Sequence, residues 1–200
     1  MARTSQPGRR EAILDAAHAV FARKGYAAAG VADLASELGI GHGTVYRYFE
    51  NKRDVAVAVL DRALTRIAEV VTAEDPSDTD DLDAYRGQVE RIGYRLYDLF
   101  AADPALGRLV FVDLAAVDDG LRDRLLRAYQ TFAGYTEAYL RNGVSKGFLR
   151  ADLEVETTAL IVNGIIFEGA AQVARAIDPR PLRDRWIRAT TRLLFDGIAA

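Results

Sequence analysis

Five side chains between positions 42 and 48 carry hydrogen-bonding or cationic groups at a spacing suited to recognising another molecule. They are His42, Thr44, Tyr46, Arg47 and Tyr48. Several of these groups sit on rigid aromatic bodies, and the helix start beside them presents free N–H groups that can meet a phosphate. A recognition helix needs such groups at its N-terminal end, where it enters the major groove of DNA. The cluster therefore indicates DNA recognition.

The residues around this cluster predict two short helices, over 31–38 and 43–49, joined by a tight turn. Gly39 permits the positive φ that such a turn needs. Apolar side chains at helical spacing lock the two helices together: Val31, Leu34, Ala35, Leu38, Ile40, Val45 and Phe49. This is the pattern of a helix-turn-helix, although a small three-helix fragment with surface aromatics would share it.

The flanking segments complete a basic first quarter of the chain. A helix over 10–24 ends at Gly25, and Asn51 with Asp54 caps a long helix that follows. Residues 1–53 hold eight Lys and Arg against five Asp and Glu, whereas residues 54–200 hold eighteen against twenty-four. A basic head on an acidic remainder favours DNA binding by the head, although an imbalance of this size also arises by chance.

The remaining residues predict an all-α body. No segment alternates at period two, and apolar residues recur at helical spacing throughout. Helices are expected over 82–101, from Asp103-Pro104, over 121–146, over 153–177 and over 182–198, with a loop at 74–81 and a hinge at 178–181. About nine helices result, divided into a DNA-binding domain over 1–53 and a helical effector-binding and dimerisation domain over 54–200.

Composition excludes several other classes of protein. The sequence has no cysteine and only two histidines, so thiolate metal sites and cysteine nucleophiles are excluded, and no metal or cofactor is expected. No Gly-rich phosphate loop, Ser-His-Asp set or calcium loop is present, which argues against an enzyme. The N-terminus lacks the apolar stretch of a signal peptide, and residues 159–177 carry too many polar groups for a membrane span, so a cytoplasmic protein without a membrane partner is expected.

Residues 13–60 resemble the DNA-binding domain of the tetracycline-repressor (TetR/AcrR) family. The matching pieces are ILDAAHAVFARKGY (13–26), VADLASELGIGHGTVYRYF (31–49) and NKRDVAVAVL (51–60), of which GTVYRYF with Lys52 is the most specific. The resemblance implies an N-terminal three-helix helix-turn-helix domain and a C-terminal ligand and dimer domain. It also implies a transcriptional regulator, expected here as a homodimeric repressor on a palindromic operator in double-stranded DNA.

The resemblance also implies roles for individual residues. Tyr46 and Lys52 match phosphate contacts. Residues expected to face bases or the flanking backbone are His42, Thr44, Arg47 and Tyr48, with Gly43 letting the helix start approach the DNA. Arg47 could pair with a guanine and Tyr48 could pack on a thymine methyl group.

This sequence departs from the family pattern at three positions near the DNA. The family usually has Ser or Thr at positions 29 and 30 and Ser at position 41, whereas this chain has Ala29, Gly30 and Gly41. Side-chain phosphate contacts at the second helix are thereby in doubt, and weaker helix caps are expected. The arginines at positions 3, 9 and 10 could reach the minor groove or a phosphate, or belong to a solubilising tail.

In the body, the expected helix over 153–177 is apolar on two sides, which suggests one face for its own core and one for a partner chain. The family pairs this helix and the last one with their symmetry mates. A small effector, mostly apolar, is expected between the body helices. Candidate contacts are Tyr94, Tyr97, Phe111, Tyr135, Asn163, Phe167 and Glu168. The alternative for each of them is an ordinary core position.

Two functions of other classes remain open from the sequence. One is a helical protein that binds a small molecule for storage or catalysis and keeps residues 31–49 as a vestige. The other is an architectural protein that binds DNA without regard to sequence. A regulator should prefer its operator over a scrambled duplex by roughly 10³-fold or more.

Overall fold

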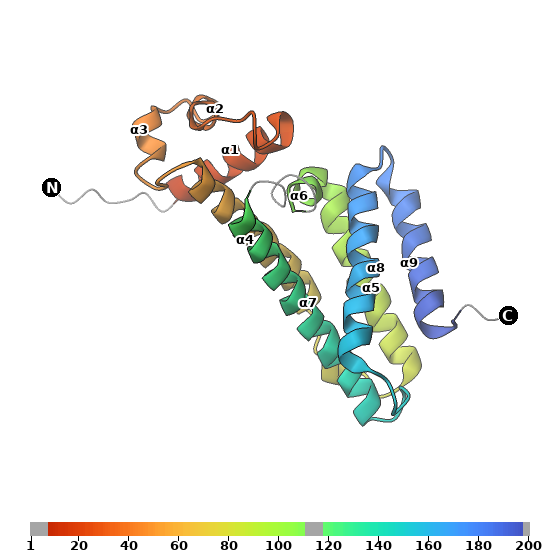
Figure 1. The fold of residues 1–200 in the computed structure, drawn as a ribbon. Coiled ribbons are helices and arrows are strands. Elements are labelled where there is room, and N and C mark those ends of the chain that lie inside the picture. Colours follow the sequence, from red (N-terminus) through yellow and green to blue (C-terminus); the bar gives the residue numbers. More distant parts are fainter. Residues whose placement is uncertain (1–7, 111–117, 198–200) are drawn as a thin grey trace.

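The structure is a computed structural model that describes residues 8–110 and 118–197, and within these ranges every regular element is a helix. Three helices form a head at one end of the molecule: α1 (Arg9–Lys24), α2 (Val31–Glu37) and α3 (His42–Val45) (Figure 1). The expectation of an all-α fold with an N-terminal helix-turn-helix is confirmed.

The body consists of long helices that run alternately away from the head and back toward it (Figure 1). The helix α4 (Lys52–Val71) leaves the head, and α5 (Leu82–Ala102) returns after a short 3₁₀ turn at Pro76–Asp78. The short α6 (Pro104–Arg108) lies next to the head. The chain then continues through α7 (Asp119–Ser145), α8 (Val155–Arg175) and α9 (Pro179–Phe195). The end of the body away from the head is called the distal end below.

Aspartate side chains define where several of these helices begin. Asp81, Asp103 and Asp118 accept hydrogen bonds from the backbone N–H groups of Ala84, Leu106 and Leu121, at 2.8, 3.1 and 2.9 Å. Each such cap satisfies a donor that the first helical turn leaves unpaired. Asn51 likewise accepts from the backbone N–H of Asp54 at 2.9 Å, as the sequence predicts for the start of α4.

Two predicted boundaries differ from the structure in an informative way. The segment 178–181 is not a hinge, because α9 begins at Pro179 with the proline in its first turn, where a missing N–H does no harm. The helix predicted from position 121 begins two residues earlier, because Asp118 caps α7 and Asp119 is its first residue. In both places a residue typical of helix ends starts a helix.

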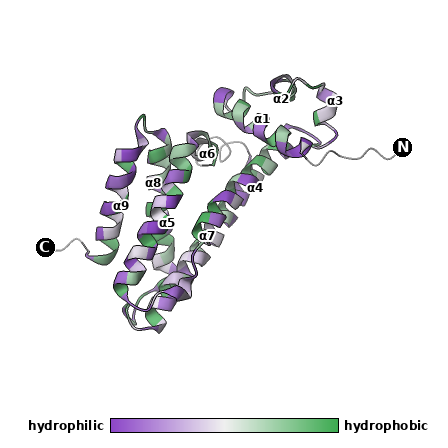
Figure 2. Ribbon diagram, turned by 180° about the vertical axis from the view of Figure 1, so that it is seen from behind, coloured by the Kyte–Doolittle hydropathy of each residue, from purple (hydrophilic) through white to green (hydrophobic). Residues whose placement is uncertain are grey.

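A single hydrophobic cluster extends from the head into the body. Ile13 and Phe21 of α1 lie in the same cluster as Val55 and Leu60 of α4 and Phe100 of α5, and all five are buried. Figure 2 shows hydrophobic and hydrophilic residues interleaved along these helices, as expected for elements that each bury one face. A second cluster, built around Tyr85 and Tyr139, lies toward the distal end.

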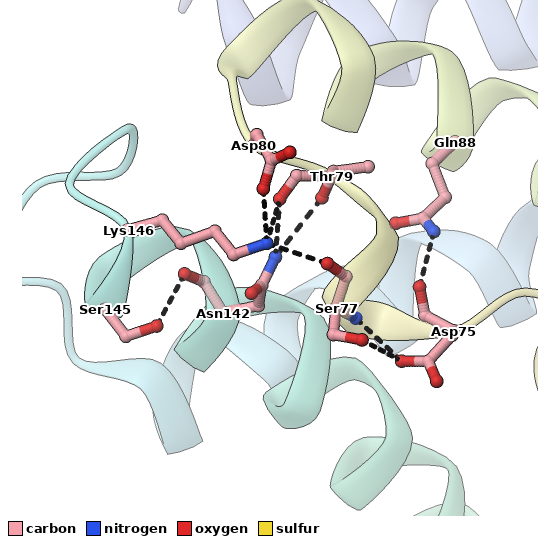
Figure 3. A network of polar contacts seen from close by, with 8 residues as sticks. All are labelled: Asp75, Ser77, Thr79, Asp80, Gln88, Asn142, Ser145 and Lys146. Atoms are coloured by element: carbon pink, nitrogen blue, oxygen red, sulfur yellow. Dashed lines mark hydrogen bonds and ion pairs between the residues drawn. The ribbon is translucent and has the colours of Figure 1, made fainter.

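The distal end is tied together by polar contacts between α7 and the segment before α5 (Figure 3). The Lys146 ammonium donates to the carbonyls of Ser77 and Thr79 at 2.7 and 2.9 Å and to the Asp80 carboxylate at 2.7 Å. The Asn142 amide donates to the Thr79 carbonyl at 3.0 Å. All three ammonium protons of Lys146 are therefore used inside the molecule.

By length and composition alone, α8 could cross a membrane, with one third of its most apolar stretch buried. A core helix passes the same test. This helix packs against α5, α6, α7 and α9 and holds a buried, hydrogen-bonded Asn163, as expected for the core helix that the sequence predicts.

Candidate nucleic-acid interface and body cavity

The turn between α2 and α3 has the geometry that the sequence predicts. Gly39 adopts φ +62°, and the Ile40 N–H donates to the Ala35 carbonyl at 2.9 Å. A residue with a side chain would be strained in this left-handed conformation. Leu34, Ala35 and Val45 are buried against α1 and α4, so the turn holds α3 at a fixed angle on the head.

The α-helix α3 is shorter than predicted, because regular α-helical bonding ends at Val45 rather than near Phe49. Residues 46–49 continue as turns, in which the N–H groups of Tyr48 and Phe49 donate to the Val45 carbonyl at 2.9 and 3.1 Å. Aromatic and β-branched residues favour the α-helix less than alanine or leucine do, which fits the early end of α3 in a run of such residues. Tyr46, Arg47 and Tyr48 thus lie on these turns.

The predicted DNA contacts differ in their exposure. His42, Gly43 and Arg47 are exposed, and Tyr46 is 54 % exposed, which is unusual for a large aromatic side chain. Thr44 and Tyr48 are half-buried, and Tyr48 packs partly against the core. Arg47 forms no ion pair with another described residue, so its five donors are available to an outside partner.

The start of α3 is open in a way that the fold itself does not require. Gly41 caps the helix without a side chain, and neither Gly41 nor Gly43 has a positive φ. A Cβ atom at either position would meet nothing within 4 Å. The absence of side chains therefore serves no internal contact and leaves the helix N-terminus bare toward the outside.

The departures at positions 29 and 30 have an internal explanation. Ala29 is 3 % exposed and belongs to the core. Gly30 is the N-cap of α2, and its N–H donates to the Asp33 carboxylate at 2.9 Å, the half of a capping box that needs no side chain at position 30. Lys24 pairs with the same Asp33 at 2.7 Å, and its hydrogen bond holds the pKa of Asp33 below the usual range.

Lys52, predicted as a phosphate contact, lies at the first position of α4 and reaches back to the head. Its ammonium donates to the Ala27 carbonyl at 3.2 Å and lies 4.2 Å from the centre of the Tyr26 ring. These contacts hold a positive charge beside the head and leave part of the ammonium's hydrogen-bonding capacity unused.

The head and the body are joined by ion pairs around α4. Asp103, which caps α6, accepts from His18 of α1 at 2.9 Å and from Arg66 of α4 at 3.0 Å. Burial raises the pKa of Asp103, but the hydrogen bonds from His18 and Arg66 outweigh it and bring the pKa to about 2. Arg53 of α4 pairs with Asp118 through two bonds of 2.6 and 3.0 Å.

The body encloses a cavity of about 360 Å³, lined by α4, α5, α7, α8, α9 and the loop between α7 and α8. This volume lies in the range of small-molecule sites. Its α5 wall extends from Leu82 to Phe100, about 27 Å at a rise of 1.5 Å per residue. The cavity lining is thus extended along α5, and most of it is apolar.

Some of the residues predicted to contact an effector line the cavity, and others do not. Tyr97, Asn163 and Phe167 line the cavity. Tyr94, Tyr135 and Glu168 do not: Tyr94 lies under the Arg183 guanidinium, Tyr135 packs near Phe132, and Glu168 accepts a hydrogen bond from Gln172. Phe111 lies outside the described residues.

Much of the distal cavity wall was absent from the sequence prediction. It includes Tyr85 of α5, Arg150 of the α7–α8 loop and Thr191 of α9. These residues lie far apart in the chain and come together only in the fold. The buried face of α9, which includes Ile187, Thr191 and Leu194, carries a helical spacing that could have pointed to Thr191. The described residues contain no group of three His, Asp or Glu side chains that could hold a metal ion.

Two neighbouring helices of the body leave apolar side chains uncovered. Leu160 and Ile161 of α8 are 45 % and 58 % exposed, and Leu193 of α9 is 44 % exposed. These two helices pack against each other. On α8, Ile166 is half-buried and Val173 is buried, whereas Leu160 is exposed.

Comparison with known proteins bears on this geometry. Residues 13–59 match the model of the bacterial regulatory proteins of the tetR family. The fatty acid metabolism regulator protein of Bacillus subtilis is 23 % identical over 156 residues, 78 % of each chain. An HTH-type transcriptional repressor of Mycobacterium tuberculosis is 39 % identical over 74 residues, which are 36 % of this chain and 39 % of that protein.

Solved structures of similar fold cover almost the whole chain. The fatty acid degradation regulator FadR from Bacillus halodurans has a TM-score of 0.82 and is 22 % identical, over 98 % of both chains. FadR from Bacillus subtilis, solved in complex with stearoyl-CoA, has a TM-score of 0.79 and is also 22 % identical, over 96 % of this chain and all of that one. At this identity they establish the fold. The match over residues 13–59 makes the head a DNA-binding domain of the tetR family type. The relatives that this chain resembles are transcriptional regulators, not enzymes.

Proposed function

We propose that the protein is a homodimeric repressor that leaves a palindromic operator when a long, mostly apolar molecule enters the body cavity. The observation that carries this proposal is the pairing of two features in one chain. The α3 end presents Arg47 and Tyr46 without partners among the described residues, and the body contains a mostly apolar cavity that is connected to the head through α4 and α6.

The DNA contacts proposed are those predicted from the sequence: His42, Gly43, Thr44, Tyr46, Arg47, Tyr48 and Lys52. Their support is the exposure of the α3 end and the absence of an internal role for its glycines. The acidic groups nearest to it on α2 are neutralised, because Glu37 pairs with Arg23 at 2.7 Å and Asp33 with Lys24. Phosphate therefore meets little uncompensated negative charge there.

The effector proposed is a fatty acyl compound. Relatives named for fatty acid metabolism and a similar fold solved with stearoyl-CoA support this class. The lining of the cavity supports it independently, since a mostly apolar wall that extends about 27 Å along α5 suits an extended chain better than a compact ring system.

Release from DNA would pass through the contacts around Asp103. The cavity wall includes Phe100 near the end of α5, and Asp103 follows three residues later at the cap of α6. Asp103 in turn holds His18 of α1. A ligand that shifts the end of α5 would move α1, change the separation of the two recognition helices and shift the population of DNA-competent dimers.

The dimer proposed uses α8 and α9, with the body over 54–200 as effector and dimer domain and residues 1–53 as DNA-binding domain. The exposed Leu160, Ile161 and Leu193 would lie at its centre. Two-fold symmetry would set two recognition helices about 34–36 Å apart. Sedimentation should give twice the chain mass for the wild type, and Ile161→Glu should give monomers. We expect the dimer to work in the cytoplasm, where bacterial DNA lies.

The test of the function is selection of duplexes from a randomised pool by the wild-type protein. A regulator should enrich a palindrome and bind it at least roughly 10³-fold more tightly than a scrambled duplex. Dodecanoyl-CoA added to the complex should then release the DNA. Equal affinity for all duplexes would leave the architectural alternative, and no DNA binding would leave the storage alternative.

A further inference from the structure

The wall of the cavity is unevenly polar along its length. Toward the head, the lining side chains of α5 and α8 include Leu96, Phe100, Ile166, Phe167 and Ala170. Tyr97 is the one hydroxyl-bearing residue in that part of the described lining, and its hydroxyl is turned toward Gly169 of α8, where a Cβ atom would lie 2.5 Å from it. The end of the cavity near the head thus offers an apolar molecule almost no polar contact.

The distal end collects hydroxyl groups from three helices. Tyr85 of α5, Thr158 of α8 and Thr191 of α9 all line the cavity there. None of their hydroxyls forms a hydrogen bond with another described residue, although Tyr85 and Thr191 are 6 % and 5 % exposed. Burial raises the pKa of Tyr85, so its phenol is protonated at neutral pH and can donate. The three hydroxyls therefore have no partner among the described residues and can hydrogen-bond to a molecule in the cavity.

Arg150 adds a positive charge at the same end. It is the only charged side chain among the described residues that line the cavity. Arg150 and Leu82 are also the only exposed residues in this described lining. Both lie at the distal end, so the cavity is closest to solvent there. Arg150 pairs with Asp152 through two bonds of 2.6 Å, with both side chains 72 % exposed. An ion pair this exposed is weak and can be replaced by another anion.

The neighbouring cation at the distal end, Lys146, is not available to bind an anion in the cavity. Its ammonium group donates its three hydrogen bonds to Ser77, Thr79 and Asp80 (Figure 3). Arg150 is thus the cation that a molecule in the cavity can reach.

We infer that the cavity orients an amphiphile, with its apolar tail toward the head and its anionic group at the distal end between Arg150 and the hydroxyls of Tyr85, Thr158 and Thr191. The inference rests on the proposed acyl ligand and adds its direction and its polar subsite. The anion is either the carboxylate of a free acid or the phosphates of a coenzyme A thioester, because both suit a guanidinium.

The first test compares dodecanoic acid, dodecanoyl-CoA and uncharged 1-dodecanol by titration calorimetry. Arg150→Gln should weaken binding of an anionic ligand roughly threefold to tenfold and leave 1-dodecanol unchanged. Asp152→Asn, which frees Arg150 from its partner, should strengthen anion binding about twofold. A gain in one variant and a loss in the other cannot both come from damage to the fold.

Arg141→Gln is the matched control, because Arg141 is an exposed arginine near the same end that pairs with Glu137 and Glu156 and does not line the cavity. It should change none of the three affinities. Loss confined to the acid identifies the carboxylate, and loss confined to the thioester identifies the phosphates. Equal effects of Arg150→Gln on the alcohol, or no effect on either anion, would overturn the inference.

The second test reads the direction of the ligand without any substitution. Trp186, the single tryptophan, packs over Gly169 beside Tyr97 in the half of the body near the head. Bromine quenches tryptophan fluorescence at short range. 12-Bromododecanoic acid should therefore quench Trp186 more than 2-bromododecanoic acid does, and the opposite order would overturn the inference. Failure of all three unbrominated ligands to bind the wild type would instead overturn the proposed effector class.

Discussion

The exposed end of α3 and the cavity of the body are both surfaces left open by the fold, but they differ in what else depends on them. At the α3 end, Arg47 forms no ion pair with another described residue, and a Cβ atom at Gly43 would meet nothing within 4 Å. Along the cavity, Tyr97, Phe100 and Phe132 are also buried members of the main hydrophobic cluster. Arg47 and Gly43 can therefore change without cost to folding, whereas these residues of the cavity wall cannot.

The difference follows from the kind of ligand that each surface takes. DNA supplies its own rigid, charged surface, so the head needs only a few donors on a fixed helix end. An apolar chain is held by many weak contacts, so the cavity needs a continuous wall that is itself part of the core. Substitutions that separate binding from stability should therefore exist in the head and be scarce in the body.

The largest effect expected is the loss of operator affinity in Arg47→Ala. Removing a guanidinium that pairs with a base should cost about 1–3 kcal/mol of binding free energy, measured by fluorescence anisotropy on the duplex selected by the wild type. The melting temperature should stay unchanged, because Arg47 has no ion-pair partner among the residues that the structure describes.

Arg122→Ala serves as the control, because Arg122 is an exposed arginine of α7 that pairs only with the neighbouring Asp119 at 2.6 Å. It should leave both affinity and stability unchanged. A fall in the melting temperature of Arg47→Ala would contradict the separation of binding from folding in the head.

In the body, Gly169→Ala should show the opposite behaviour. A Cβ atom there would lie 2.2 Å from Trp186 Nε1, so the indole must move. Overpacking of this kind typically costs about 1–3 kcal/mol, and urea denaturation should show the loss together with altered Trp186 fluorescence. Gly134→Ala on α7, where a Cβ atom meets nothing, should not destabilise the protein. Full stability of Gly169→Ala would show that the wall near Trp186 is looser than its packing indicates.

Between the two regions, Asp103 should make stability depend on acid. Its pKa of about 2 in the folded protein lies below the value of about 3.9 in an unfolded chain. The charged form thus stabilises the fold fully above about pH 5, and this contribution disappears as the pH falls toward 2. Comparing urea denaturation of wild type and Asp103→Asn should give a difference of up to about 2 kcal/mol at pH 5 that shrinks at pH 2.5. A difference independent of pH would mean that Asp103 acts only as a helix cap.

The sequence predicts the head far better than the cavity, and the physical reason is distance along the chain. The elements of the head are local: Gly39 needs a positive φ, Asn51 meets Asp54 three residues later, and Val45 and Phe49 lie one turn apart. Each of these relations can be deduced from neighbouring letters. The length of α3 was overestimated, since the apolar spacing of Val45 and Phe49 holds for turns as well as for an α-helix.

The cavity depends on residues brought together from five helices and a loop. The candidate contacts named from the sequence include Tyr97 and Phe167, which line the cavity, and Tyr94 and Tyr135, which lie elsewhere. Periodicity gives the face of a helix that is buried, not the neighbour it meets. The sequence gives no reason to assign Arg150 to the cavity, because a single arginine in a loop has the same pattern as an ordinary solvent-exposed charge. Only the fold shows that it lies at the mouth of the cavity.

The smallest effect expected is also the sharpest test of the head, in Gly43→Ala. Alanine is the better helix former, and its Cβ atom meets nothing here, so the free energy of unfolding should rise by about 0.5 kcal/mol. Operator affinity should nonetheless fall a few-fold, because the new methyl group stands where the start of α3 meets the DNA backbone. Gly134→Ala should show the first effect without the second. If Gly43→Ala binds the operator as tightly as the wild type, then the helix start does not approach the DNA closely, and recognition rests on the side chains that follow it, with Arg47 foremost.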